Sequence, residues 1–430
     1  MFTRIAMMAV TAALPALGAV AAAGASETAA ARVAAVQRAA VASSPALAAT
    51  LREAALLGAE ARTEAAAVSP YLEWQSEGLG GDRTPNAQDT LRLGTPFNFF
   101  GQAGPARDLA RAAEEGTEAI AHTAVRAVAV ESTRRWLALA AAVERVEIRR
   151  RRSERLDAAL TRLEARHRLG EVSGTEVAQL DLDRTSAASL LAAAEAEVEV
   201  QAEGVAELCG PRFPRPQPGD LEALAELSST PDAARIVEEA VAAGVPMQRV
   251  RFEAELEEAR ARMAAATAWG RPMIEAEWER FPSLGGLDGY DAWGFRLAVP
   301  LPLGSAGARQ REAARERQAL AAAARDAALA ETVRGARSAL TVATGAASRL
   351  RSIAPALDGI GRIEESLFAQ YRLGALSYLE YVYGVFRHDE VLLGAIDART
   401  ELLLARLDLG YLLDDPSLFP MAALSMEEGS

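Results

Sequence analysis

The chain has 430 residues and a formal net charge of -13, which argues against a broad nucleic-acid-binding surface. Half of the residues are hydrophobic but only 5% are aromatic, and long alanine-rich stretches favour helices because alanine has the highest intrinsic helix propensity. The chain contains no lysine, which excludes lysine-dependent chemistry. Its single cysteine, Cys209, excludes an intrachain disulfide and a multi-cysteine metal site.

The first 25 residues have the pattern of an export signal. Arg4 precedes an apolar run, and Ala23-Gly24-Ala25 before Ser26 fits the small-x-small cleavage pattern. The alternative is a retained membrane anchor. Farther along, no uncharged apolar stretch reaches the roughly 18 to 20 residues of a transmembrane helix, so any later contact with a membrane is expected to use strands.

Two parts of the chain resemble each other at an offset of 204 residues. Arg168-Leu169-Gly170 recurs as Arg372-Leu373-Gly374, and Glu73-Trp74 recurs as Glu277-Trp278. Repeated anchors at one offset predict two similar halves. The predicted organisation is a signal peptide (1–25), a first structural repeat (26–210), a Pro-rich linker (211–231), a second structural repeat (232–413) and a flexible C-terminal tail (414–430).

Each half is expected to follow the same order of elements. In the first half, a helical segment over 32–68, broken at Ser43-Ser44-Pro45, precedes a β-hairpin, a very long helix over 104–167 and a return helix after Gly170. The second half repeats the hairpin, a long helix over 306–371 and a return helix after Gly374. Pro355 is expected to kink or break the second long helix, because proline removes a helical hydrogen bond.

The strands alternate between an apolar and a polar face. The side chains expected to face lipid are Trp278, Trp293, Phe295, Leu297 and Val299, whereas Glu275, Glu277 and Glu279 alternate with such residues. Four strands cannot close into a barrel, and lipid does not tolerate an open sheet edge. Three copies would supply about twelve strands, an even number within the usual range of outer-membrane barrels. The alternative is a soluble hairpin packed on a helical bundle.

Two stretches carry a family resemblance: Val299-Pro300-Leu301-Pro302-Leu303 before the second long helix, and Tyr371-Arg372-Leu373-Gly374 with Ser377 and Glu380. With them, the chain resembles the TolC-like outer-membrane efflux proteins from about Val33 to Leu413, in the branch that serves heavy-metal and related resistance-nodulation-division pumps.

The resemblance implies a mainly α fold with a small β part. A long α-helical coiled-coil barrel would join two β-hairpins that form a 12-stranded β-barrel in a homotrimer. It implies a passive exit duct in the bacterial outer membrane that extends into the periplasm, contacts outer-membrane lipid and a periplasmic adaptor, and reaches an inner-membrane pump indirectly. No enzymatic activity, cofactor or nucleic-acid partner is implied. The alternative function is a periplasmic adaptor-like coiled-coil interaction protein of an export system.

The resemblance also assigns sites. The adaptor-docking tip would comprise Arg168, Leu169, Gly170, Val172, Ser173, Arg372, Leu373, Gly374, Leu376 and Ser377. Glu176 and Glu380 would form an acidic ring at the entrance gate. At a second position where some relatives carry acids, this chain has Gln179 and Tyr383. The alternatives are glycines that only end helices and glutamates on a solvated helix face.

Other candidate chemistry is weak. His388-Asp389-Glu390 has ligand-type side chains but lies inside a predicted helix beside Arg387, so no metal site is expected there. Cys209 is expected to be a small buried hydrophobe rather than a nucleophile.

Overall fold

The computed structural model describes residues 29–66, 69–77, 88–96, 101, 103–227, 244–267, 272–281, 288–299, 305–373, 375–415 and 418–419. The predicted signal peptide lies outside the described residues. Among the described helices, none combines the length and apolar character needed to cross a membrane.

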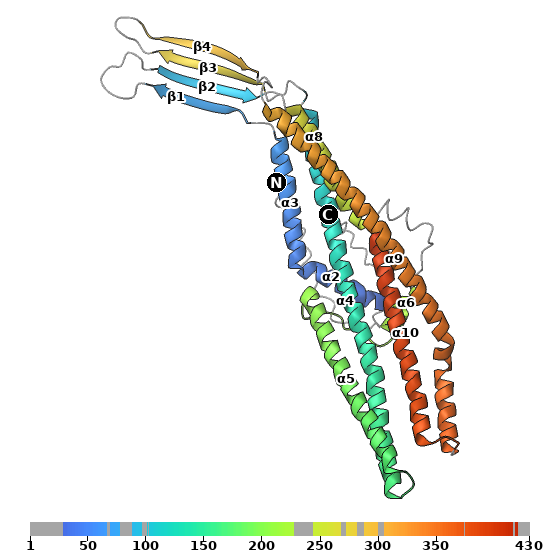
Figure 1. Cartoon of the computed structure of the whole chain (residues 1–430). Coiled ribbons are helices and arrows are strands. Elements are labelled where there is room, and N and C mark those ends of the chain that lie inside the picture. Colours follow the sequence, from blue (N-terminus) through green and yellow to red (C-terminus); the bar gives the residue numbers. More distant parts are fainter. Residues whose placement is uncertain are drawn as a thin grey trace. The chain divides into compact units, whose positions relative to one another are not determined.

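Apart from α6, which lies in the predicted linker, the helices and strands follow the predicted order (Figure 1). The elements of the first half are α2 (Ala29–Ser43), α3 (Pro45–Ala65), β1 (Tyr71–Glu77), β2 (Gln88–Pro96), α4 (Ala103–Arg168) and α5 (Gly174–Cys209). Those that follow are α6 (Asp220–Leu227), α8 (Val245–Thr267), β3 (Met273–Phe281), β4 (Tyr290–Ala298), α9 (Ser305–Arg372) and α10 (Tyr378–Leu413). The mainly α fold with a small β part is therefore confirmed.

Of the kink or break expected at Pro355, the break was wrong, because α9 continues through this residue. A proline inside a helix leaves the carbonyl of the residue four positions earlier, here Arg351, without its helical donor. Arg351, Ala354 and Ala356 are all exposed, so solvent can satisfy that carbonyl and the helix can continue.

The described chain divides into two compact units, each of which draws on both halves of the sequence. Unit 1 comprises Met1–Leu47, Ala124–Val245 and Glu331–Ser430, and unit 2 comprises Ala48–Thr123 and Pro246–Ala330. The compact units therefore do not coincide with the predicted repeats, because helices from one half pack on helices from the other.

The largest hydrophobic cluster of unit 1 gathers α2, α4, α5, α6 and α10 around Trp136. Trp136 is fully buried, and its indole N–H donates a hydrogen bond to the carbonyl of Pro214 at 2.9 Å. Arg32 forms a buried ion pair with Asp220, which ties α2 to the start of α6. Cys209 lies in the same cluster, where burial raises the pKa of its thiol to about 11, so it is a buried hydrophobe as predicted.

Two segments predicted to lie outside the repeats belong to this core. The predicted linker contains α6, whose Leu221 and Leu224 are fully buried. The predicted flexible tail contains Leu418 and Phe419, which are also buried. In both segments the buried apolar residues belong to a short stretch without a long periodic pattern. Only the residues that they pack against therefore show that they belong to the core.

Helices α9 and α10 pack in unit 1 through a seam of small side chains. Ala336, Ala339, Ala343 and Ala346 of α9 contact Leu402, Ala405, Leu409 and Leu413 of α10. Alanines at spacings of three and four form a flat stripe, which lets the helix axes approach closely. The alanine-rich composition therefore reflects close helix packing as well as helix propensity.

Unit 2 contains a small helical core and the sheet. Residues of α3, the start of α4 and α8 form the core, with Leu109, Phe252 and Met263 among its larger members. The sheet has four antiparallel strands in the order β1-β2-β3-β4, so the two hairpins are joined through β2 and β3 (Figure 1).

Candidate functional site

One face of the sheet is apolar along its whole width. The register aligns Trp74, Leu91, Trp278 and Trp293 in one row and Leu72, Leu93, Ala276 and Phe295 in the next. Trp293 is 73% exposed and Phe295 is 82% exposed. Leu72, Trp74 and Leu93 are exposed as well, whereas Leu91 and Trp278 are half-buried.

The structure brings the predicted lipid-facing residues together on this apolar face. Leu297 pairs with Ile274 and Trp293 pairs with Trp278. Val299 is exposed directly after β4, two residues beyond Leu297. Because side chains alternate along a strand, it continues the same face.

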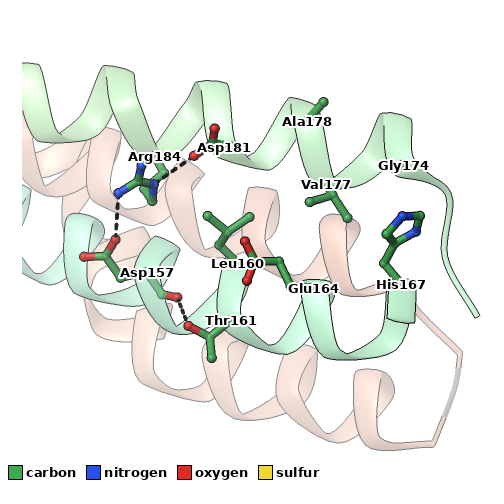
Figure 2. A pocket seen from close by; sticks show the side chains of 10 residues that line it. All are labelled: Asp157, Leu160, Thr161, Glu164, His167, Gly174, Val177, Ala178, Asp181 and Arg184. Carbon is green, nitrogen blue, oxygen red and sulfur yellow. Dashed lines mark hydrogen bonds and ion pairs between the residues drawn. The ribbon is translucent and has the colours of Figure 1, made fainter. Parts of the chain in front are cut away.

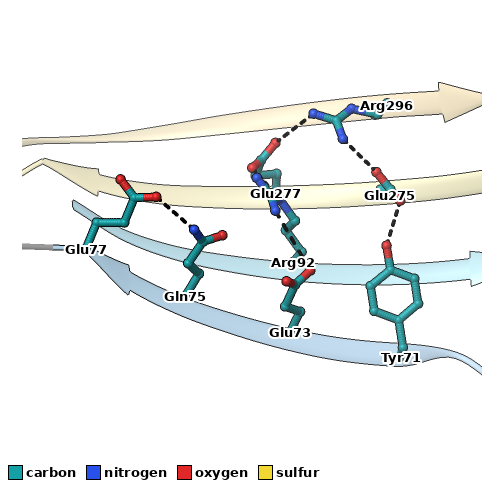
Figure 3. A network of polar contacts seen from close by, with 8 residues as sticks. All are labelled: Tyr71, Glu73, Gln75, Glu77, Arg92, Glu275, Glu277 and Arg296. Carbon is teal, nitrogen blue, oxygen red and sulfur yellow. Dashed lines mark hydrogen bonds and ion pairs between the residues drawn. The ribbon is translucent and has the colours of Figure 1, made fainter.

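The opposite face carries a connected network of charged and polar side chains (Figure 3). Arg92 donates to Glu277 at 2.7 Å and lies 3.8 Å from Glu73. Arg296 lies 3.3 Å from Glu275 and 3.9 Å from Glu277. The network crosses all four strands, so the polar face links the two hairpins.

Tyr71 reaches across one strand to join this network. Its hydroxyl donates a hydrogen bond to Glu275 at 2.6 Å, although β2 lies between β1 and β3. Gly94 of β2 stands between the two residues in the register, and a Cβ at that position would lie 2.2 Å from the tyrosine ring. The glycine is therefore needed for the close approach of the ring.

The two hairpins are not related by the 204-residue offset throughout. Glu73 pairs with Arg92, but the matching residue Glu277 pairs with Gly294, and Arg296 faces Glu275 instead. The second hairpin connection runs from Phe281 to Tyr290 and is two residues shorter than the first, from Glu77 to Gln88. The sequence match of Arg92 with Arg296 therefore does not correspond to equivalent positions in the ladder.

The predicted tip residues of the first half lie in the turn between α4 and α5, in unit 1. The N–H of Gly170 donates to the carbonyl of His167 at 2.9 Å, and Gly170 has a φ of +76°, which disfavours other residues. Arg166 forms an ion pair with Glu171 at 2.9 Å. The N–H of Leu169 donates to the carbonyl of Arg166 at 3.1 Å, whereas its side chain is 75% exposed.

The second turn joins α9 to α10 and is similar where the structure describes it. The N–H of Leu373 donates to the carbonyl of Ala369 at 3.0 Å, and the Leu373 side chain is 85% exposed. Gly374 and the side chain of Arg372 lie outside the described residues. The two turns thus present one exposed leucine each.

Ser173 and Ser377 are the N-caps of the return helices α5 and α10. At Ser377 the capping box is complete: its N–H donates to Glu380 Oε2 at 2.8 Å, and the Glu380 N–H donates to Ser377 Oγ at 3.2 Å. The hydrogen bonds that the Glu380 carboxylate accepts from Ser377, first from its backbone N–H and then from its side chain, lower the pKa of Glu380 and keep it ionised. The S-x-x-E spacing, present at both turns, was the sequence signal for this local role.

Gln179 and Tyr383, at the second position where some relatives carry acids, contact each other. Tyr383 donates from its hydroxyl to Asp183 at 2.7 Å and accepts a hydrogen bond from the Gln179 amide at 3.2 Å. Burial, followed by the bond to Asp183, raises the pKa of Tyr383. These bonds join α5 to α10, a link that sequence reasoning missed because residues 200 positions apart meet only in the folded chain.

A groove of about 550 Å³ lies between α4 and α5 near their turn (Figure 2). Arg184 binds Asp181 at 3.0 Å and lies 3.7 Å from Asp157, which closes the polar end of the groove. His167 and Gly174 line the end near the turn. Among the described residues, no group of three or more His, Cys, Asp or Glu could hold a metal ion.

Solved structures share this arrangement of long helices and a small sheet. The outer-membrane channel MtrE of Neisseria gonorrhoeae matches with a TM-score of 0.69 and 15% identity over 91% of this chain and 90% of its own. The outer-membrane protein VceC of Vibrio cholerae matches with a TM-score of 0.66 and 16% identity over 89% of this chain and 96% of its own. The Campylobacter jejuni CmeC outer-membrane channel matches with a TM-score of 0.66 and 14% identity over 90% of this chain and 86% of its own.

The chain has the TolC-like outer-membrane channel fold. The resemblance inferred from the sequence motifs is confirmed at the level of the fold. No protein-family model matches the sequence, and no curated protein matches it.

Replacing Tyr383 with Phe is expected to weaken the link between α5 and α10. The change removes the hydroxyl that binds Asp183 and Gln179, and should lower the local free energy of opening by about 1–2 kcal/mol. Hydrogen exchange of the amides near Asp183 and Tyr383 measures this loss. The control is Tyr381→Phe, because the Tyr381 ring stacks on Tyr371 with centroids 5.5 Å apart and that contact does not need a hydroxyl. Equal exchange in both variants would refute a role of the Tyr383 hydroxyl.

Proposed function

We propose that this chain is the exit duct of a tripartite efflux system in the bacterial outer membrane. The observation that carries the proposal is the two-faced sheet: its apolar face is uncovered, while its other face carries a connected charge network. The fold shared with outer-membrane channel proteins supports the same function. A duct conducts its cargo without catalysis, so the proposal requires no enzymatic chemistry.

The sheet supports assembly into a homotrimer. Strands β1 and β4 are its edges in the described part of the chain, and unpaired edge groups are costly in lipid. Three copies would join edges to close a barrel of about twelve strands. The apolar face with Trp293 and Phe295 would then contact lipid, and the network around Glu277 would face the aqueous lumen.

The tips support contact with a periplasmic adaptor. Leu169 and Leu373 are exposed at the two turns, although capping and backbone hydrogen bonds already satisfy the local structure there. Exposed apolar side chains at corresponding positions fit a partner surface better than a structural task. Through this adaptor the duct would connect indirectly to an inner-membrane pump, which we propose to be of the resistance-nodulation-division type.

We also propose that Glu176 and Glu380 form an acidic ring in the trimer. Each is the third residue of a return helix, directly inside a turn. Glu380 is exposed and ionised, which supports a preference for cations at an entrance built from three copies.

Cell fractionation tests the proposed function directly. The mature protein is expected in the outer membrane, as a trimer on unheated gels, and purified trimers should conduct ions across planar bilayers. Closure of the strand edges and the lumen both depend on assembly, so monomers should not conduct. A soluble monomer would contradict the duct and favour the alternative, an adaptor-like periplasmic interaction protein.

The double variant Leu169→Glu with Leu373→Glu is expected to abolish efflux. Charges at both tips would remove the apolar contact with the adaptor, so the affinity for the adaptor should fall at least about tenfold, which corresponds to about 1.4 kcal/mol. Drug or metal resistance should be lost with it. The trimer and its conductance should persist. Leu56→Glu is the matched control, because Leu56 is 58% exposed on α3 in unit 2. Normal resistance in the tip variant would refute adaptor docking at these leucines.

Glu380→Gln tests the acidic ring. A glutamine can still accept the hydrogen bond from the Ser377 N–H, so the capping box and α10 should be retained. The charge is lost, and single-channel recordings are expected to show a lower preference for cations over anions. Glu390→Gln is the control, because Glu390 lies farther along α10 and binds Arg152 at 3.1 Å. Unchanged selectivity in Glu380→Gln would exclude the ring.

A further inference from the structure

A carboxylate is buried where three helices of unit 1 meet. Asp389 of α10 is only 3% exposed. Its Oδ1 lies 3.4 Å from Arg155 of α4, and its Oδ2 has no hydrogen-bond partner among the described residues. An ionised carboxylate with an unsatisfied buried oxygen is costly, whereas the protonated form costs much less.

The charged groups around Asp389 come from each element packed against it. From α4, Arg155 also lies 3.6 Å from Glu364 of α9, and Arg152 binds Glu390 of α10 at 3.1 Å. From α10 itself, His388 Nδ1 lies 3.7 Å from Glu364 and makes no hydrogen bond in the described structure.

Burial raises the pKa of Asp389 to about 6, with Glu364 and Glu390 acting in the same direction and Arg155 and Arg152 opposing it. Because the pKa in the packed state lies above the ordinary value of 3.8, proton binding favours the packed state. The stabilisation of the packed state by proton binding to Asp389 is complete below the ordinary pKa of 3.8 and is lost as the pH rises through about 6.

Asp389 lies on the face of α10 that packs against α4 near the two turns. Tyr378, Val382 and Phe386 of α10 pack with Leu156 and Leu163 of α4 near the turns. Asp389 follows Phe386 by three residues, so it lies on the same face. The side chain of Arg152 covers the Phe386 ring, with its guanidinium carbon 4.3 Å from the ring centroid. A change in charge at Asp389 therefore acts on the contact between the α4–α5 and α9–α10 pairs.

We propose that Asp389 is a proton-operated lock between α10 and its neighbours α4 and α9. When protonated it holds the two helical turns together, and when Asp389 is ionised the turns part more readily. As a regulator of opening, the lock rests on the proposed duct, whose entrance the turns would form. The proton-dependent packing itself is a property of unit 1.

Distances between spin labels on the two turns test the lock without relying on conduction. Labels are placed at the exposed Thr175 and Ala375 in a Cys209→Ser background, in full-length protein diluted with unlabelled copies. The ratio of packed to parted turns is expected to rise about tenfold from pH 7.5 to pH 5, given a packed-state pKa of about 6 and an ordinary value of 3.8. A ratio that does not change with pH would overturn the lock.

Two variants separate the lock from general destabilisation. Asp389→Asn mimics the protonated carboxyl and should keep the turns packed at both pH values. Arg155→Gln removes a cation that favours ionised Asp389, so the midpoint of the change should move above about pH 6. The control Glu390→Gln, at a more exposed residue beside Asp389, should retain a strong pH response. An Asp389→Asn protein that titrates like the parent would refute the proposal.

Bilayer conductance distinguishes failure of the lock from failure of the duct. If purified trimers conduct but the label distances do not titrate, the duct stands and the lock is refuted. If the distances titrate and no conductance is found, the lock stands as a property of the helices and the duct is refuted. If both hold, open probability should fall as the pH is lowered from 7.5 to 5, and Asp389→Asn should abolish that fall.

Discussion

The constraint on which the rest of the structure depends is the sheet with one apolar face and two unpaired edges. Aromatic side chains such as Trp293 and Phe295 stand exposed on that face, while strands β1 and β4 end the described sheet. In a single copy, water would leave the apolar face exposed to a polar solvent, and lipid would leave the backbone groups of the two edges without hydrogen-bond partners. The proposed assembly of several copies would resolve both at once, so the sheet is the strongest physical argument for the proposed membrane-embedded oligomer.

The helices are subject to a different constraint: they pack closely against one another, which requires small side chains at their contacts. The stripe from Ala336 to Ala346 packs on α10, and the few large aromatic side chains of unit 1 are placed where several helices meet, as at Trp136. This division explains why a chain of this length contains so few aromatic residues. Aromatic side chains lie in the sheet, near the turns and in one helical core, whereas alanine side chains line the contact between long helices.

The turns show how one short motif can serve structure and function together. Glycine ends the long helix at Gly170, and serine begins the next helix at Ser173. Glu380 completes a capping box at the second turn. These roles account for the repeated residues by local physics, yet they leave the side chains of Leu169 and Leu373 exposed. The exposed leucines, rather than the repeated glycines, therefore carry the argument for a partner.

The sequence by itself determined the order of the elements, the two-faced strands and the resemblance that proved correct for the fold. These follow from periodicity and local turn chemistry, which act over a few residues. Only the tertiary structure showed that Arg296 faces Glu275, that Tyr383 binds Asp183, that Leu418 and Phe419 join the core, and that Asp389 is buried beside Arg155. Most of these contacts join side chains far apart in the sequence. Their partners are decided by how whole helices and strands pack, which no local pattern encodes.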